Sequence, residues 1–227
     1  MAAGRGRKTD EAQGPGQAGR SGAPRRRAEQ QRAIETREKI IAAAETEFVT
    51  RGFEGASTRE IAKQAGVQHT MVPYHFESKD GLWQAVLDRL IRNFTELQHA
   101  RLEGLRGVDS RTQLRLLFEE FIRYSAANLN LHKLMTAASA GTGPQIDTIV
   151  TDYLSDYFAL IAGLIAEVQK DGGFVRGDPN HLHYLFIGSA TRIFMQSREV
   201  ARMIGRSPLD PEFVDLHIEQ CFDLFFR

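Results

Sequence analysis

The stretch from Ser57 to Phe76 constrains this chain more than any other, because it specifies two short helices joined by a tight turn. Ser57 and Glu60 form a capping-box pattern, in which the Ser hydroxyl accepts the amide of Glu60 and the Glu carboxylate accepts the amide of Ser57. A helix is therefore expected to begin here. Gly66 is expected to end it, because the left-handed conformation of a helix end is costly for a residue with a Cβ.

The segment that follows, Gln68 to His75, is too short and too polar to be a core helix, although Val67, Val72 and Phe76 can anchor it. A short helix held at a steep angle by a glycine-containing turn is the geometry in which a second helix enters a DNA major groove. The sequence therefore predicts a helix-turn-helix unit that reads DNA.

The residues from Thr36 to about Leu87 resemble the TetR-type transcriptional regulators. The resemblance rests on motifs that occur together: Ile40, Ala44 and Phe48; Gly52-Phe53; Ser57-Thr58; Ile61-Ala62; Ala65-Gly66-Val67; His75-Phe76; Ser78-Lys79; and Leu82. It implies an all-α fold with an N-terminal three-helix helix-turn-helix DNA-binding domain and a C-terminal helical-bundle domain for ligand binding and dimerisation. It also implies a homodimer that binds double-stranded DNA at a palindromic operator as a repressor and is released by a small apolar or aromatic effector.

The resemblance assigns DNA contacts position by position. Base edges are expected to be contacted by Arg59, Gln68, His69, Thr70, Met71 and Tyr74, and phosphates by Ser57, Thr58, His75 and Lys79. Pro73 departs from the family pattern, which often has a tyrosine there. Because proline lacks an N–H and crowds the carbonyl four residues before it, the second helix is expected to bend or end early, at roughly 3 kcal/mol if nothing compensates. Tyr74 is expected to take over part of the phosphate contact.

Residues 1–32 carry a net charge of +5, and the remainder of the neutral chain therefore carries −5. This segment is rich in Gly, Pro, Ala and Gln and has few large apolar residues, which predicts a disordered basic arm. Two interpretations remain open for Arg25, Arg26 and Arg27: a solubilising tail, or an arm that lies along phosphates or in the minor groove. Their position beside the DNA-reading unit favours the second.

Apolar spacing and turn signals predict helices over the rest of the chain. They are expected at 34–51, 78–97, 110–127, 129–139, 145–170, 179–202 and 211–226. The DNA-binding domain is assigned to 33–80 and the effector-binding and dimerisation domain to 81–227, with the helix from Ser78 as the link. The last helix is apolar nearly all round, which predicts that a second copy covers Phe213, Ile218, Phe222 and Phe225.

Apolar and aromatic residues of several helices are candidate walls of an effector pocket: Trp83, Phe121, Tyr124, Met135, Tyr153, Tyr157 and Phe194. Pockets of this kind are mostly apolar with a few polar anchors. Arg192 stands among small and apolar neighbours, where a guanidinium needs a partner. Two partners remain open: an internal carboxylate, Asp152 or Asp156, or an acidic group of the ligand.

No catalytic constellation, metal-ligand cluster or cofactor motif is evident, so neither enzyme activity nor a cofactor is expected. His181 and His183 point away from one another on a helix, and the single cysteine, Cys221, is expected to be a buried thiol. No apolar run approaches the length of a membrane span and the start lacks a secretory signal, which predicts a cytoplasmic protein without a membrane partner. The alternatives are a helical-bundle carrier or enzyme, and a DNA-architectural protein without an effector.

Overall fold

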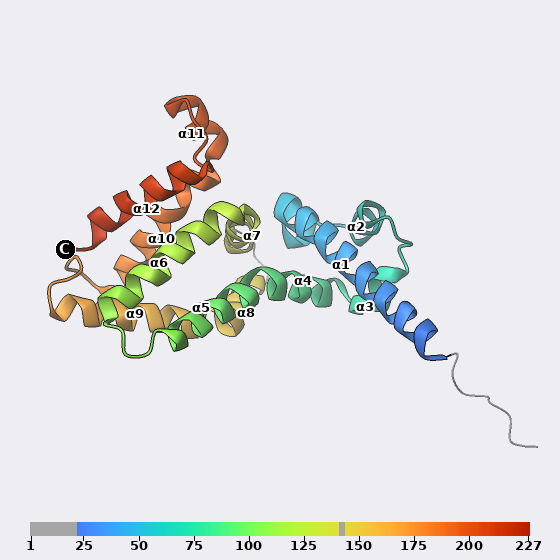
Figure 1. The fold of residues 1–227 in the computed structure, drawn as a ribbon. Helices are drawn as coiled ribbons and strands as arrows, with labels where there is room; N and C mark the ends of the chain where they lie inside the picture. The colour runs from blue at the N-terminus through green and yellow to red at the C-terminus, as the bar shows by residue number, and fades with distance from the viewer. Residues whose placement is uncertain (1–21, 141–143) are drawn as a thin grey trace, which may run out of the picture.

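The computed structural model describes residues 22–140 and 144–227, which form two helical lobes (Figure 1). The N-terminal lobe contains α1 (Gly22–Gly55), α2 (Thr58–Ala65) and α3 (Met71–Phe76), and α4 (Lys79–Leu87) leads out of it. The C-terminal lobe contains η1 (Asp88–Arg92), α5 (Asn93–Gly104), α6 (Ser110–Ala127), α7 (Leu129–Ala140), α8 (Gln145–Ile149), η2 (Val150–Leu154), α9 (Ser155–Lys170), α10 (Pro179–Met195), α11 (Ser197–Ile204) and α12 (Pro211–Phe225).

Two of the predicted helices contain a π-helical turn. The helix expected at 78–97 is α4, η1 and α5 in succession and continues to Gly104, and the helix expected at 145–170 is α8, η2 and α9. The helix expected at 179–202 is instead broken at Gln196 into α10 and α11. In α1 the backbone breaks at Gly52, where φ is 68°, which confirms the predicted end of its main helical run.

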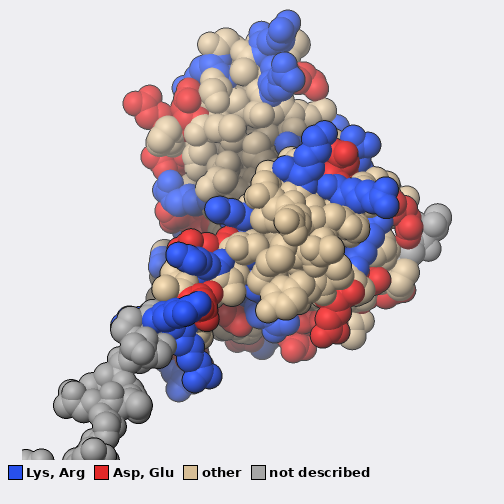
Figure 2. Space-filling model, turned by 90° about the vertical axis from the view of Figure 1, so that its right-hand side faces the viewer, with Lys and Arg blue, Asp and Glu red and all other residues tan. Residues whose placement is uncertain are grey.

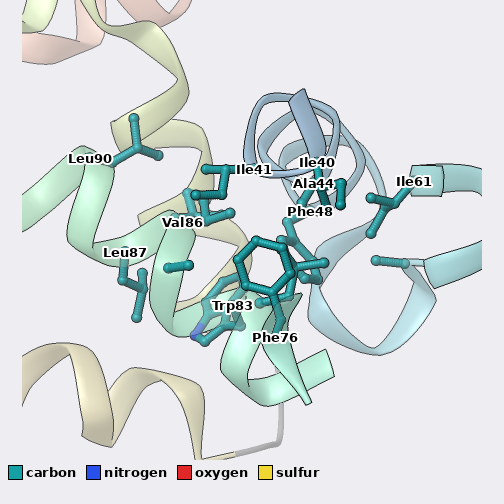
Figure 3. Close-up of a cluster of buried hydrophobic side chains, with 14 of the residues drawn as sticks. Ile40, Ile41, Ala44, Phe48, Ile61, Phe76, Trp83, Val86, Leu87 and Leu90 are labelled. Atoms are coloured by element: carbon teal, nitrogen blue, oxygen red, sulfur yellow. The ribbon is translucent and has the colours of Figure 1, made fainter. Parts of the chain in front are cut away.

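The core of the N-terminal lobe lies between α1 and α4 (Figure 3). The Trp83 ring lies edge-on to Phe48 at 5.0 Å and to Phe53 at 5.5 Å. Trp83 therefore packs in the N-terminal lobe, and the expectation that it lines an effector pocket is wrong. The apolar spacing of α4 does not reveal which of two lobes each of its faces contacts.

The same apolar core continues into the C-terminal lobe through α7. Leu131, Leu134 and Ala138 of α7 belong to the cluster that contains Ile41 and Ala44 of α1. One polar bond joins the same two helices, since Asn130 Nδ2 donates to Glu45 Oε1 at 2.7 Å. The two lobes are therefore packed against one another by α1 and α7, in addition to being linked by α4.

A second core, rich in phenylalanine, holds α6, α9, α10 and α12 together. The rings of Phe118 and Phe186 stack at a centroid distance of 3.5 Å. The four residues expected at a dimer interface are only 5–8% exposed within a single chain: Phe213, Ile218, Phe222 and Phe225. That expectation is wrong because helices of the same chain cover this face of α12. Cys221 lies in the same core, and burial raises the pKa of its thiol to about 11, as expected for an inert thiol.

The helix of α8, η2 and α9 is long and apolar enough to cross a membrane by length and composition. The expectation that no such stretch exists is therefore wrong. Buried helices of soluble proteins pass the same criterion, and here α9 packs on α6 and α10 through Tyr157, Ile161 and Ile165. The criterion is weak evidence for a membrane span in this setting.

Candidate DNA-binding face and effector cavity

The start of α2 is fixed by an acceptor other than the predicted one. Ser57 Oγ accepts the Glu60 amide at 3.5 Å, which is the expected half of the capping box. The Ser57 amide donates instead to Glu47 Oε1 of α1 at 3.3 Å, and the Glu60 carboxylate lies 3.7 Å from the Lys63 ammonium. At the other end Gly66 has φ 69° and ψ 33°, which confirms its predicted role as the left-handed cap.

Glu47 is a buried carboxylate that the sequence analysis missed. It is 3% exposed and accepts Gln64 Nε2 at 3.2 Å, while Arg51 Nε lies 3.1 Å from its other oxygen. A buried charge requires such partners. Glu47 therefore fixes the angle between α1 and α2, and with it the position of the second helix. The available signal was an acidic residue on the apolar face of the first helix, beside Phe48.

Pro73 does not bend α3, because it is the third residue of that helix. The amides of a first helical turn have no acceptor within the helix, so proline removes no bond there. The turn before it is closed by the Met71 amide to the Gln68 carbonyl at 2.9 Å and the Val72 amide to the His69 carbonyl at 3.2 Å. The predicted bend is wrong: α3 begins at Met71 rather than Gln68, and it extends through Phe76.

The ten predicted DNA contacts gather on one part of the N-terminal lobe: the start of α2, the turn, α3 and the start of α4. Arg59, Gln68, His69, Thr70 and Tyr74 are exposed, Tyr74 by 75%. Ser57, Thr58, Met71, His75 and Lys79 are half-buried. The structure shows contact between Thr58 and His69 and places Met71, Tyr74 and His75 in one surface groove.

Two of the half-buried residues, Thr58 and Lys79, also make contacts within this lobe. Thr58 Oγ1 lies 3.2 Å from His69 Nε2, which ties α2 to the turn. Lys79 Nζ donates to the Glu54 carbonyl at 3.1 Å and lies 4.8 Å from the Phe53 ring centre, and the ammonium has two further donors for a phosphate. Burial and then the charge of Arg37 lower the pKa of His75, so this ring adds no positive charge at neutral pH.

Arg25, Arg26 and Arg27 lie in a helix because α1 begins at Gly22, and their side chains are exposed. The predicted disordered arm is therefore wrong for residues 22–32, while residues 1–21 lie outside the described residues. A surface groove of about 300 Å³ between α1 and α3 is lined by Arg32, Ala33, Thr36, Met71, Tyr74 and His75. Figure 2 shows Lys and Arg side chains beside an uncharged area on this lobe. The basic start of α1 thus extends from the edge of the reading helix.

The C-terminal lobe contains a cavity of about 190 Å³. It is lined by Ile91, Phe94, Phe121, Leu131, His132, Met135, Leu154, Tyr157, Phe158, His183, Tyr184 and Ile187. Of the predicted pocket residues, Phe121, Met135 and Tyr157 line it. Tyr124 does not, because it lines a separate surface groove and donates its hydroxyl to the Leu90 carbonyl at 2.9 Å. Phe194 packs in the second core beside His217, at a centroid distance of 5.2 Å.

Tyr153 and Arg192 also lie elsewhere. The Tyr153 hydroxyl is 2.9 Å from Asp88 Oδ1, so this residue joins the two π-helical turns. Arg192 is exposed on α10, whose inward face there is formed by Thr191 and Phe194. Among the described residues it does not pair with Asp152 or Asp156, so the predicted internal ion pair is wrong, and it does not line the cavity. An exposed guanidinium is solvated by water.

Two cavity residues, His132 and His183, were not among the predicted pocket residues. They are 9% and 5% exposed, and burial lowers the pKa of each to about 4. His132 Nε2 and His183 Nδ1 have no hydrogen-bond partner among the described residues. Their signal in the sequence is a polar residue at an apolar position of a helix, which also fits an ordinary core histidine.

The paired helices, their exposed polar and aromatic side chains and the adjoining helical lobe define a helix-turn-helix DNA-binding protein. Residues 40–86 match the family model described as bacterial regulatory proteins, tetR family. The regulator RutR of Escherichia coli is 26% identical over 200 residues, which span 87% of this chain and 92% of RutR. The transcriptional activator FasR of Mycolicibacterium smegmatis is 31% identical over 139 residues, which span 58% of this chain and 63% of FasR.

A solved structure supports the fold. HlyIIR, a hemolysin II transcriptional regulator, superposes with a TM-score of 0.58 at 23% identity over 83% of this chain and 97% of that one. The chain belongs to the TetR family of DNA-binding transcriptional regulators, which are not enzymes. As a regulator that binds DNA it acts inside the cell.

The two cavity histidines make stability depend on pH. Between about pH 4 and their ordinary pKa of 6.5 the unfolded chain binds protons that the folded chain does not, so the free energy of unfolding rises with pH in this range. Acidification from 6.5 towards 4 is expected to remove about 1.4 kcal/mol per pH unit for each histidine. Urea unfolding at several pH values measures this.

The double variant His132→Phe, His183→Phe is expected to flatten this dependence, since it removes both groups. His181→Phe is the matched control, because His181 is exposed on the same helix as His183. Equal slopes for the wild type and the double variant would show that the histidines titrate normally in the folded chain.

Proposed function

We propose that this protein is a homodimeric repressor that binds a palindromic operator in the cytoplasm and releases it when a small apolar or aromatic molecule occupies the cavity. The observation that carries this proposal is the position of α7. Leu131, His132 and Met135 of α7 line the cavity, and Leu131 and Leu134 of the same helix pack in the core of the DNA-binding lobe. One helix therefore contacts both the cavity and α1.

Polar contacts reinforce this connection at the same place. Glu45 of α1 accepts Asn130 of α7 at 2.7 Å and lies 3.7 Å from Arg89 of η1. Ile91 of η1 and Leu154 of η2 line the cavity, and both π-helical turns are joined by the Tyr153–Asp88 bond. Single π-helical turns are frequent at functional sites. A ligand that moves α7 or η1 would therefore move α1 and α4, which carry the reading unit.

For release, the ligand must bind better to a conformation whose reading helices no longer fit successive major grooves. The cavity and its contact with α7 favour an effector-responsive regulator over a DNA-architectural protein without an effector. FasR of Mycolicibacterium smegmatis, which is similar to this chain, is a transcriptional activator, so the sign of regulation is a separate question from the presence of an effector. Operator affinity measured with and without the ligand shows whether ligand binding weakens or strengthens DNA binding.

The experiment begins with selection of an operator from randomised DNA, followed by a thermal-shift screen of aromatic acids, nucleobases and fatty acids. Compounds that raise the melting temperature are expected to release the operator. Asn130→Ala removes the bond to Glu45 and is expected to retain ligand binding but to weaken release, whereas Lys133→Ala, exposed on the same helix, is expected to change neither. A cavity ligand that leaves operator affinity unchanged would contradict the proposal.

The DNA contacts of the reading unit follow from its exposed residues. Arg59 is exposed in the first turn of α2, and a bidentate contact of Arg with guanine contributes about 1–3 kcal/mol of discrimination. Arg59→Ala is therefore expected to relax specificity at one base pair of each half-site. Selection on randomised DNA with both proteins measures this, and unchanged information at every position would refute the assignment.

Two comparison variants separate base contacts from phosphate contacts. Lys63→Ala, exposed on the same helix and paired with Glu60, is expected to leave the selected motif unchanged. Replacement of Arg25, Arg26 and Arg27 by Ala is expected to weaken binding to all DNA sequences alike. It is also expected to reduce the salt dependence of binding, because fewer counterions are released.

The proposed dimer uses the faces of α10 and α12 that the chain itself leaves uncovered. On α12 these carry Leu216 and Leu224, which are 40% and 62% exposed, and on α10 Leu185, which is 50% exposed. Gly188 on the same side of α10 has open space around its Cα, which permits close helix approach. A two-fold dimer through this surface would impose a palindromic operator.

The double variant Leu216→Asp, Leu224→Asp is expected to be a folded monomer at micromolar concentration, because both side chains lie outside the protomer core. Leu97→Asp is the control, since Leu97 is 49% exposed on α5. Sedimentation and circular dichroism separate dissociation from unfolding. A monomeric wild type, or a double variant that remains dimeric, would reject this interface.

A further inference from the structure

The cavity is apolar except for two histidines and two tyrosines. No Asp, Glu, Lys or Arg is found among its described lining residues. His132 enters from α7 and His183 from α10, and each is more than nine-tenths buried. Each of these two rings has a nitrogen without a hydrogen-bond partner among the described residues.

Aromatic neighbours hold both imidazoles in place. The His183 ring stacks on Phe158 at a centroid distance of 4.6 Å, and the His132 ring lies edge-on to Phe121 at 6.0 Å. Phe158 and Phe121 line the cavity as well. His132 Nε2 and His183 Nδ1 have no partner among the described residues, although most buried polar atoms in folded proteins do. Among the described residues neither imidazole has a ring hydrogen bond, and both residues line the cavity.

The charge of a partner in this cavity follows from the surroundings. Burial holds the pKa of both imidazoles at about 4, so neither carries a charge at neutral pH. A carboxylate or an ammonium group would have no opposite charge in the lining, and an unpaired buried charge is strongly disfavoured. A neutral imidazole has one N–H donor and one acceptor nitrogen. A hydroxyl group, which both donates and accepts, can therefore bond to either tautomer.

The size of the partner follows from the cavity volume of about 190 Å³. An engineered apolar cavity of about 150 Å³ in another protein stays dry and binds benzene. The present cavity therefore has room for one aromatic ring with a small substituent.

We propose that the cavity binds an uncharged single-ring aromatic molecule whose hydroxyl group hydrogen-bonds with the imidazoles of His132 and His183. This rests on the proposed function, because it names the chemical class of the effector and its polar anchors. The two histidines, and not the exposed Arg192, are then the polar anchors of the ligand. The ligand is uncharged and not an acid. The ring packs against the phenylalanines of the wall, and the two imidazoles select for the hydroxyl.

The test uses the full chain and four probes with the same ring: benzyl alcohol, toluene, benzoate and benzylamine. Ligand-observed NMR and calorimetry at neutral pH measure the dissociation constants. Benzyl alcohol is expected to bind about tenfold more tightly than toluene, the ratio that corresponds to one satisfied hydrogen bond. Benzoate and benzylamine are expected to bind more weakly than toluene. The proposal would be overturned if benzoate bound at least as tightly as benzyl alcohol or if toluene bound as tightly as benzyl alcohol. Absence of binding by all four probes would also overturn it.

Variants locate the site. His132→Phe and His183→Phe are each expected to weaken the binding of benzyl alcohol about tenfold, because the hydrogen bond is removed. The affinity for toluene is expected to stay unchanged. His181→Phe, exposed on α10, is expected to change neither. Long-range ¹H–¹⁵N spectra of the wild-type imidazoles are expected to shift with benzyl alcohol, which tests the contact without any substitution. Unshifted signals, or full affinity in the double variant, would overturn the assignment.

Operator binding separates this proposal from the one on which it rests. Benzyl alcohol that binds through the histidines but leaves the operator complex intact would refute the regulatory role and retain the ligand class. Release of the operator by another compound, with benzoate bound more tightly than benzyl alcohol, would refute the ligand class and retain the regulatory role.

Discussion

The packing of α7 on α1 is the contact on which the arrangement of this protein depends. Leu131, Leu134 and the Asn130–Glu45 bond place a helix of the C-terminal lobe in the core of the DNA-binding lobe. Closely packed interiors have few voids, so a displacement on one side of such a helix is transmitted rather than absorbed. A reading unit joined only through α4 could move independently. With α7 in the same core, the DNA-binding lobe packs against a helix that also lines the cavity.

Within the DNA-binding lobe, Glu47 positions α2 relative to α1. Its buried carboxylate accepts the Ser57 amide and the Gln64 side chain, so the first turn of α2 is positioned by α1 as well as by the half of the capping box that forms. A wholly apolar contact between α1 and α2 would leave their rotation about one another less restricted. Hydrogen bonds are directional, and they fix the angle at which α2 supports the turn and α3. Specific reading of DNA requires that angle.

The sequence predicts the helices well because their ends depend on neighbouring residues. Asp109 caps α6 by accepting the Thr112 amide, and Gly66 adopts the left-handed conformation that ends α2. Those signals also bring the ten predicted DNA contacts to one surface. Which face of a helix is covered depends on residues far along the chain, and periodicity carries no such information. Phe222 is buried and Leu224 exposed two positions later, so an apolar helix alone does not distinguish a protomer core from a dimer interface.

The same limit explains why the sequence predicts only part of the cavity wall. Phe121, Met135 and Tyr157 follow from the rule that apolar and aromatic residues of converging helices form pockets, but Tyr153, Phe194 and Trp83 obey that rule equally and pack elsewhere. The two histidines are found only when burial and hydrogen bonding are known for each nitrogen. An apolar residue at either position would satisfy the fold at least as well, since it leaves no buried atom unpaired. The fold therefore does not require these imidazoles, in a wall whose other polar side chains are two tyrosines. The proposed ligand would complete their hydrogen bonds, and it would contact α7, the helix that packs on α1.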